Sequence, residues 1–184
     1  MQSVPHPTRD RLIEELLARE GGYVGDPNDS GGKTNFGVTE RVARRFGYRG
    51  DMEGMPRAKA VEIYIAQYWD ALGLDEVCFL SQKLAEKLFD AGVNCGVPRA
   101  AEWLQRALNV FNRNGADYPD VTMDGDVGPA TLNALKSFAA KRGEPGLNNV
   151  TKAVAALQGA HYINLAEKRA KDEAFINGWF QNRG

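Results

Sequence analysis

The sequence has few of the residues that build metal centres, disulfide frameworks or histidine-based catalytic sites. It contains only two cysteines, Cys78 and Cys95, and two histidines, His6 and His161. Two cysteines so far apart fit neither a disulfide framework nor a cluster of metal ligands. The isolated histidines leave little material for a His-based triad. We therefore expect no metal and no cofactor, and two reduced, partly buried thiols.

The sequence also lacks a strong net charge and a long apolar run. A net charge of -1 and a pI near 6.2 give no global field that would attract nucleic acid. No apolar stretch is long enough to span a bilayer, and the first ten residues lack the apolar core of a secretory signal. We expect a protein that is synthesised in the cytoplasm without a recognisable signal peptide, with no nucleic-acid partner and no membrane insertion. We also expect a monomer.

The apolar residues recur at helical spacing nearly throughout the chain, which predicts a mainly α fold. Capping residues and prolines mark successive helix starts at Thr39, Pro56, Ser81, Pro98 and Pro129. Residues 21 to 38 are rich in Gly, Asn, Asp and Pro and predict a loop with one short β-hairpin. The stretch from Gly143 to Asn149 predicts a last break, followed by one long terminal helix.

Glu20 ends the first amphipathic segment, and the helical spacing of Ile13, Leu16 and Leu17 continues onto it. The spacing places this carboxylate on the apolar stripe, and the two glycines that follow end the helix. Partial burial and the negative end of the helix dipole would both favour the protonated acid. Such an acid can donate a proton to a glycosidic oxygen. The alternative is an exposed helix-terminal residue, or one that is satisfied by a neighbouring arginine.

The loop after Glu20 supplies Asp29 and Thr34. Hydrolysis of a glycoside needs a second group that positions water or stabilises the oxocarbenium-like transition state. Asp29 and Thr34 are the candidates for that task. The local alternative is that Asp29 bonds its own turn and Thr34 caps or pairs in a short strand.

The run from Glu20 to Thr39, which begins Glu-Gly-Gly-Tyr and continues Asp-Pro-Asn-Asp-Ser-Gly-Gly-Lys-Thr-Asn-Phe-Gly-Val-Thr, resembles the signature of the family 108 glycoside hydrolases. These are N-acetylmuramidases of the lysozyme-like superfamily. The resemblance implies a lysozyme-like helical fold and implies that Glu20 is the catalytic acid. A more distant similarity is to phage-type lysozymes, whose Asp and Thr are separated by five residues. Here four residues separate Asp29 from Thr34, so the role of Thr34 is less well supported than that of Asp29.

Aromatic residues near the catalytic loop are candidates for binding sugar rings, whose C–H faces pack on aromatic faces. Tyr23 directly follows the two glycines, and Tyr64 and Tyr68 lie at helical spacing in a stretch similar to one in family 108. Aromatics at this spacing also form cores, and we expect one of Tyr64 and Tyr68 to reach the substrate. Asp90 and Asn94 stand in a segment that resembles the one lining the cleft of lysozyme-like folds. The alternative is a left-handed turn at Asn94 and a solvent-facing Asp90.

The C-terminal half carries Asp124-Gly-Asp-Val-Gly128-Pro129-Ala-Thr131, which resembles the core of small helical peptidoglycan-binding modules. The motif also has a structural explanation, because Asp-Gly makes a turn and Pro129 starts a helix. We expect a lysozyme-like catalytic region over residues 8–95 and a helical peptidoglycan-binding-like region over residues 96–182. The short connection between them predicts that the two pack as one compact unit.

Together these features predict a peptidoglycan hydrolase, a muramidase or endolysin that cleaves the β-1,4 bond between N-acetylmuramic acid and N-acetylglucosamine. The catalytic residues would be Glu20, Asp29 and Thr34, and the groove would be shaped by Tyr23, Tyr64, Tyr68, Asp90 and Asn94. Its partner would be the glycan strands of the cell wall, which it would reach through a holin or a dedicated exporter. Two alternatives remain, a non-catalytic wall-binding protein and a hydrolase of chitin or chitosan. The inverting or retaining outcome stays open.

Overall fold

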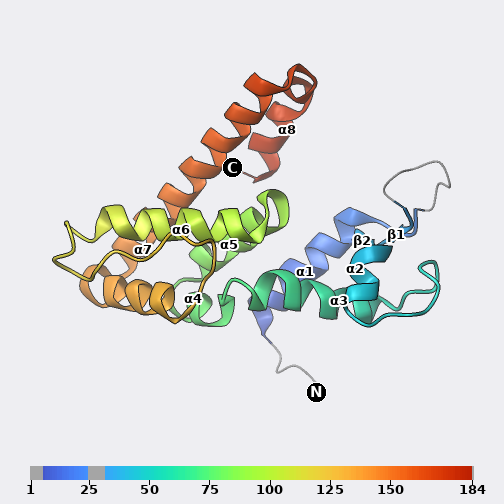
Figure 1. Cartoon of the computed structure of the whole chain (residues 1–184), viewed down its shortest axis with the longest axis horizontal. Coiled ribbons are helices and arrows are strands. Elements are labelled where there is room, and N and C mark those ends of the chain that lie inside the picture. Colours follow the sequence, from blue (N-terminus) through green and yellow to red (C-terminus); the bar gives the residue numbers. More distant parts are fainter. Residues whose placement is uncertain (1–5, 25–31, 184) are drawn as a thin grey trace. The chain divides into compact units, whose positions relative to one another are not determined.

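The computed structural model describes residues 6–24 and 32–183 (Figure 1). The chain divides into two compact units, Met1–Trp69 and Asp70–Gly184. The boundary expected at residue 96 falls inside the second unit. The expected division into regions 8–95 and 96–182, and their packing as one unit, stays a prediction. Each unit is described separately below.

The N-terminal unit contains three helices and a small sheet in its described part. These are helix α1 (Pro7–Glu20), strands β1 (Thr34–Asn35) and β2 (Val38–Thr39), α2 (Glu40–Arg45) and α3 (Arg57–Tyr64). A π-helix, η1 (Ile65–Asp70), continues α3. The apolar stripe of α1 buries Ile13, Leu16 and Leu17, as its spacing predicted. An ion pair between Arg57 and Glu14 links α3 to α1.

The two strands form the short β-hairpin expected in the catalytic loop. They pair antiparallel, with Thr34 opposite Thr39 and Asn35 opposite Val38. The two loop residues, Phe36 and Gly37, have φ angles of 50° and 72°. Positive φ at both central positions is characteristic of the two-residue hairpin turn whose twist matches that of the flanking strands. Thr39 then caps α2, because its side chain accepts a hydrogen bond from the Val42 N–H.

The C-terminal unit is helical wherever it has regular structure. Its elements are α4 (Leu74–Leu80), α5 (Gln82–Cys95), α6 (Val97–Phe111), α7 (Pro129–Lys168), a 3₁₀ turn η2 (Ala170–Asp172) and α8 (Glu173–Arg183). Helix α5 packs against α4, α6 and α7 (Figure 1). The core contains Leu84, Leu88, Leu104, Leu108 and Leu135, all fully buried. Cys78 and Cys95 are half-buried thiols that form no disulfide.

Most of the expected helix starts are confirmed, and the fold is mainly α as predicted. Pro56 is the N-cap of α3, Ser81 caps α5 through the Leu84 N–H, and prolines open α6 and α7. Among residues 6–24 and 32–183, no helix is both long and apolar enough to cross a membrane.

Two expectations about helix boundaries were wrong, and two short elements were not anticipated. The break predicted from Gly143 to Asn149 is confined to Gly143 (φ 59°, ψ -161°), and α7 resumes directly after it. Pro145 is tolerated because it lies in the first turn of the new segment, where a backbone N–H needs no helical partner. The terminal helix stops at Lys168 and a turn separates it from α8. Helix α4 and the π-helix were not anticipated, because both are short and their apolar residues pack in tertiary contacts.

A buried glutamine holds together the motif that resembles peptidoglycan-binding modules. Gln105 is 1% exposed, and its amide nitrogen donates hydrogen bonds to the Asp124 carboxylate (2.7 Å), the Asp126 carbonyl (2.8 Å) and the Thr131 hydroxyl (3.2 Å). Its oxygen accepts a hydrogen bond from the Gly125 N–H at 3.1 Å. The bond from Gln105 also lowers the pKa of Asp124. The structural role expected for this motif is therefore present in the fold.

Replacing this glutamine tests how far the loop depends on it. Gln105→Ala removes four hydrogen bonds and empties a fully buried side-chain position, and we expect it to lower the free energy of unfolding by about 2–4 kcal/mol. Gln82→Ala is the matched control, because Gln82 is exposed and bonds Glu86 on the surface; we expect a change within about 0.5 kcal/mol. Denaturant unfolding measures both. Equal values for the two variants would contradict the assigned role.

Candidate functional site

Glu20 is the last residue of α1, and Gly21 ends the helix with a φ of 75°. The residue is exposed, so the burial expected from the apolar stripe was wrong. The stripe ends at Leu17, which is 4% exposed, and every described residue from Ala18 to Val24 is exposed. The helix extends one turn beyond its packed part, and this turn carries the carboxylate out to solvent.

The carboxylate of Glu20 nevertheless lies directly against the hairpin turn. A Cβ atom placed on Gly37 would stand 2.8 Å from Glu20 Oε2 and 2.9 Å from its Cγ. The same atom would stand 2.5 Å from the hydroxyl oxygen of Tyr64. Only a glycine backbone therefore fits between these two side chains. The turn, the carboxylate and the phenol meet at one point.

Tyr64 fixes the turn from the side of α3. It is 6% exposed, and its hydroxyl donates a 2.9 Å hydrogen bond to the carbonyl of Phe36. A residue with a side chain is strained at positive φ, and Phe36 is held there by this bond. Asn35 anchors the other side, because its buried amide donates to the carbonyls of Met52 (2.7 Å) and Glu53 (3.2 Å). The hairpin is thus held at two points.

Tyr68 lies beside Tyr64, within the π-helix η1. The two rings are stacked, with centroids 5.8 Å apart and planes 22° from parallel. Burial raises the pKa of both phenols, and the negative charge of Glu20 raises each pKa further. Both hydroxyls therefore stay protonated at neutral pH.

The carboxylate of Glu20 is not engaged elsewhere in the described chain. Over residues 6–24 and 32–183 it makes no hydrogen bond and no ion pair. The alternative of a neighbouring arginine that satisfies it is therefore not what the structure shows. Glu14 and Glu15, on the same helix, are both paired with arginines. Glu20 differs from them in that its carboxylate oxygens remain available to a ligand.

Two other expected residues of the catalytic loop are also placed. Thr34 is half-buried in β1, and its N–H donates a 2.8 Å bond to the Val24 carbonyl. Because side chains alternate along a strand, Thr34 points to the face opposite the anchoring Asn35. Tyr23 is 37% exposed, close to the end of α1. Asp29 lies outside the described residues.

Asp90 and Asn94 belong to α5 in the C-terminal unit, and their polar groups are engaged there. The Asn94 amide donates to the Asp90 carboxylate (2.7 Å) and to its carbonyl (2.8 Å). The other carboxylate oxygen accepts from buried Gln158 at 3.0 Å and pairs with Lys87 at 3.4 Å. These bonds give the two residues a structural role in their own unit. Their place in a substrate groove stays a prediction.

Sequence reasoning missed three residues of the site, Asn35, Phe36 and Gly37. A partial signal was present, because Gly in the second position of a two-residue loop between strand-forming residues is typical of a hairpin, whereas Phe in the first position is not. What the sequence does not contain is the close approach of Glu20 and Tyr64 to Gly37. Among the described residues, no group of three His, Cys, Asp or Glu side chains is placed to hold a metal ion.

Comparison with known proteins identifies two family models that match the chain. Residues 13–96 match the family model described as "Glycosyl hydrolase 108", and residues 99–184 match one described as "Predicted Peptidoglycan domain". Residues 13–96 form a family 108 glycoside hydrolase domain. The chain is therefore a glycoside hydrolase that acts on peptidoglycan.

The fold of the chain is also similar to a solved structure. That structure, "Structure of Brucella abortus SagA", has a TM-score of 0.66 and 24% identity. The match covers 96% of this chain and 89% of that chain. At this level of identity the likeness concerns the fold alone. A search of curated proteins finds no match.

Substitution of two glycines that both have positive φ distinguishes the effect of backbone strain from the effect of a side-chain clash at the site. Gly37 and Gly47 both have positive φ, but a Cβ on Gly47 would meet nothing within 4 Å. We expect Gly47→Ala to cost about 1–2 kcal/mol of stability from its left-handed backbone and to keep activity. Gly37→Ala also displaces Glu20 and Tyr64, and a shift of about 1 Å at a catalytic group can lower the rate about a hundredfold.

The measurements are denaturant unfolding and the rate of release of soluble fragments from purified cell wall, at a temperature where both variants are folded. Gly37→Ala should lose far more activity than Gly47→Ala for a similar loss of stability. Equal activity in the two variants would show that the contact at Gly37 does not position the site.

Proposed function

We propose that this peptidoglycan hydrolase cleaves the β-1,4 bond between N-acetylmuramic acid and N-acetylglucosamine, with Glu20 as the general acid. The observation that carries the proposal is the carboxylate of Glu20, which makes no hydrogen bond or ion pair among the described residues and lies against the Gly37 backbone beside the hydroxyl of Tyr64. The family 108 match over residues 13–96 supports the reaction class.

The chemistry needs a proton on the leaving oxygen as the glycosidic bond breaks. Glu20 in its protonated form donates that proton, and the C–O bond to the anomeric carbon then breaks as positive charge develops on the sugar. A water molecule adds to the anomeric carbon and completes the hydrolysis. The hairpin turn lies directly against the acid and limits the space open to its side chain, which favours a defined position for the proton donor.

The surrounding residues take supporting roles in this proposal. Tyr64 positions the turn, because its hydroxyl is committed to the Phe36 carbonyl. Tyr68, half-buried next to it, and exposed Tyr23 then contact the sugar rings through their aromatic faces. Asp29 orients the water or stabilises the developing charge, and Thr34 is the second candidate for that task. Asp90 and Asn94 are proposed to border the groove.

The wall is reached through a holin or a dedicated exporter in this proposal, and the active form is a monomer. The match of residues 99–184 to a predicted peptidoglycan domain supports a second contact with the wall. This contact would keep the enzyme on its polymeric substrate between cuts. It would act by raising the local concentration of glycan strands at the catalytic unit.

Glu20→Gln preserves the shape of the side chain and removes the proton. We expect the release of reducing ends from purified peptidoglycan to fall by about 10²- to 10⁴-fold, the usual contribution of a general acid. Glu15→Gln is the matched control, because Glu15 is an exposed glutamate of the same helix that pairs with Arg11. This control should keep full activity, and thermal unfolding should show that both variants are folded.

Product analysis in the same assay tests the bond. Muramic acid at the new reducing ends supports the proposal, and N-acetylglucosamine there contradicts it, as does faster cleavage of chitin oligomers. Degradation of the wall by Glu20→Gln at the rate of the unmodified enzyme would contradict the role of Glu20.

Variants of the two candidate partners distinguish their roles. If Asp29 assists the water or the charged transition state, Asp29→Asn lowers kcat by about 10²-fold or more with little change in KM. Thr34→Val keeps the strand and removes the hydroxyl, and we expect a drop of less than about tenfold. The assay is steady-state cleavage of soluble glycan strands. The reverse order of effects would assign the second catalytic role to Thr34.

A further inference from the structure

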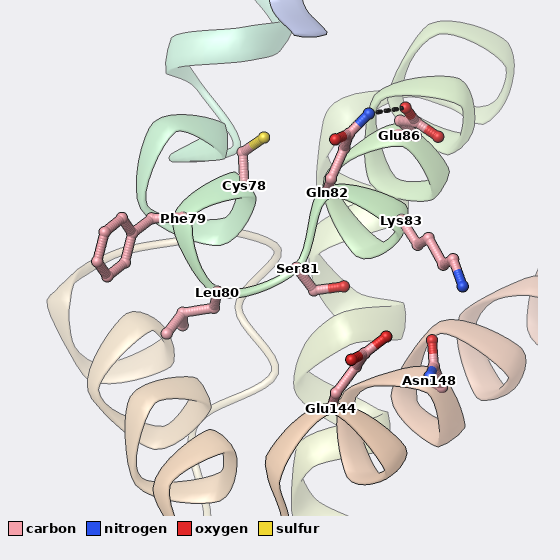
Figure 2. A pocket seen from close by; sticks show the side chains of 9 residues that line it. All are labelled: Cys78, Phe79, Leu80, Ser81, Gln82, Lys83, Glu86, Glu144 and Asn148. Atoms are coloured by element: carbon pink, nitrogen blue, oxygen red, sulfur yellow. Dashed lines mark hydrogen bonds between the residues drawn. The ribbon is translucent and has the colours of Figure 1, made fainter.

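The C-terminal unit contains a pocket that the proposed reaction does not use. It has a volume of about 540 Å³ and lies between the turn joining α4 to α5 and the part of α7 that follows Gly143. Ser81 and Lys83 line it from the start of α5, and Glu144 and Asn148 line it from α7. Figure 2 shows these four polar side chains directed into the same space. The pocket lies wholly within one compact unit.

The polar groups of this pocket are not satisfied by one another. In the part of the chain that the structure describes, neither Lys83 nor Glu144 has an ion-pair partner, and the Asn148 side chain makes no hydrogen bond. Ser81 accepts a bond from the Leu84 N–H at 3.2 Å, and its hydroxyl proton remains free to be donated. Elsewhere in this unit, Lys136 pairs with Glu76 and Lys141 with Asp117. A second carboxylate of the lining, Glu86, accepts a hydrogen bond from Gln82. Lys83 on α5 and Glu144 on α7 are exposed to solvent, and the pocket thus presents one cation and one anion that no described side chain pairs.

This arrangement selects the charge of a ligand. A simple anion would be attracted by Lys83 and repelled by Glu144. A simple cation would be attracted by Glu144 and repelled by Lys83. A group that carries an ammonium and a carboxylate on one carbon satisfies both walls at once. The amide of Asn148 and the hydroxyl of Ser81 can then bond the remaining carboxylate oxygen. Burial of the ligand in a concave site strengthens each of these bonds.

We propose that this pocket binds a zwitterionic α-amino-acid group, of the kind found at the free end of a diamino acid in the stem peptides of peptidoglycan. The ammonium of the ligand pairs with the Glu144 carboxylate, and the carboxylate of the ligand pairs with the Lys83 ammonium. The inference rests on the proposed function, since it takes the cell wall as the substrate. The proposal adds that the C-terminal unit binds the stem peptides of the wall, while the N-terminal unit cleaves the glycan strands.

The binding experiment uses the full chain and a defined peptide. The synthetic tripeptide L-Ala-γ-D-Glu-meso-diaminopimelate is titrated calorimetrically into the protein, beside the same peptide with L-lysine as its third residue. The lysine peptide keeps the side-chain ammonium and lacks the adjacent carboxylate. We expect the diaminopimelate peptide to bind at least about tenfold more tightly. Equal affinity for the two peptides, or no binding of the first, would overturn the proposal.

Substitutions in the pocket test the assigned contacts. Lys83→Met and Glu144→Gln should each weaken binding of the diaminopimelate peptide by about tenfold or more. Lys152→Met and Glu167→Gln are matched controls, because both residues are exposed on α7 and lie outside the pocket. They should leave the affinity unchanged. If the double variant Lys83→Met/Glu144→Gln binds as tightly as the unmodified protein, the pocket is not the site.

Cleavage of peptide-free glycan strands tests the pocket proposal and the catalytic proposal separately. Cleavage of glycan strands stripped of their peptides should be unchanged in Lys83→Met and Glu144→Gln, because no stem peptide is present. Binding of the tripeptide should be unchanged in Glu20→Gln. Loss of cleavage of stripped strands in the pocket variants would overturn the separate role of the pocket. Full activity of Glu20→Gln would overturn the catalytic proposal and leave the peptide titration as an independent result.

Discussion

The hydrogen bond from the Tyr64 hydroxyl to the Phe36 carbonyl joins helix α3 to a turn that residues with side chains adopt only under strain. The position of the turn places the backbone of Gly37 against the carboxylate of Glu20, where no side chain would fit. The geometry of the acid therefore depends on a contact between three segments, the end of α1, the hairpin and α3. The anchoring of Asn35 to the carbonyl of Met52 makes this arrangement rigid.

The two units of this hydrolase use buried polar groups in different ways. In the N-terminal unit, such groups hold a backbone turn beside an exposed carboxylate, so the reactive group stays free while its support is fixed. In the C-terminal unit, Gln105 satisfies the loop around Asp124 completely, which explains the motif without a ligand. The polar side chains around the pocket at Lys83 and Glu144 lack such partners. Lys83 and Glu144 are exposed and solvated, and what points to the pocket as a binding site is that a cation and an anion line the same cavity.

Much of the fold follows from local patterns in the chain. Thr39 and Ser81 cap helices because their side chains can bond a free N–H, and the prolines at 98 and 129 open helices for the same local reason. The pattern failed at Gly143, where a helix resumed after a single residue, and at the π-helix, whose extra residue per turn has no sequence signature. In the site, Glu20 and the tyrosines were identified from their motif, and the burial expected for Glu20 was wrong. Periodicity shows which side of a helix is apolar and cannot show where its packed part ends.

The sequence by itself determined the elements and the chemical groups: a mainly helical chain, a glycine-rich loop after a helix-terminal glutamate, and the motif of family 108. These depend on residues close together in the chain, whose steric and hydrogen-bonding preferences act locally. Only the tertiary structure decided that Tyr64 supports the turn, that Gly37 must lack a side chain, and that Lys83 and Glu144 face one space. Those facts depend on distances between segments that are remote in sequence, and such distances are set by the packing of the whole unit.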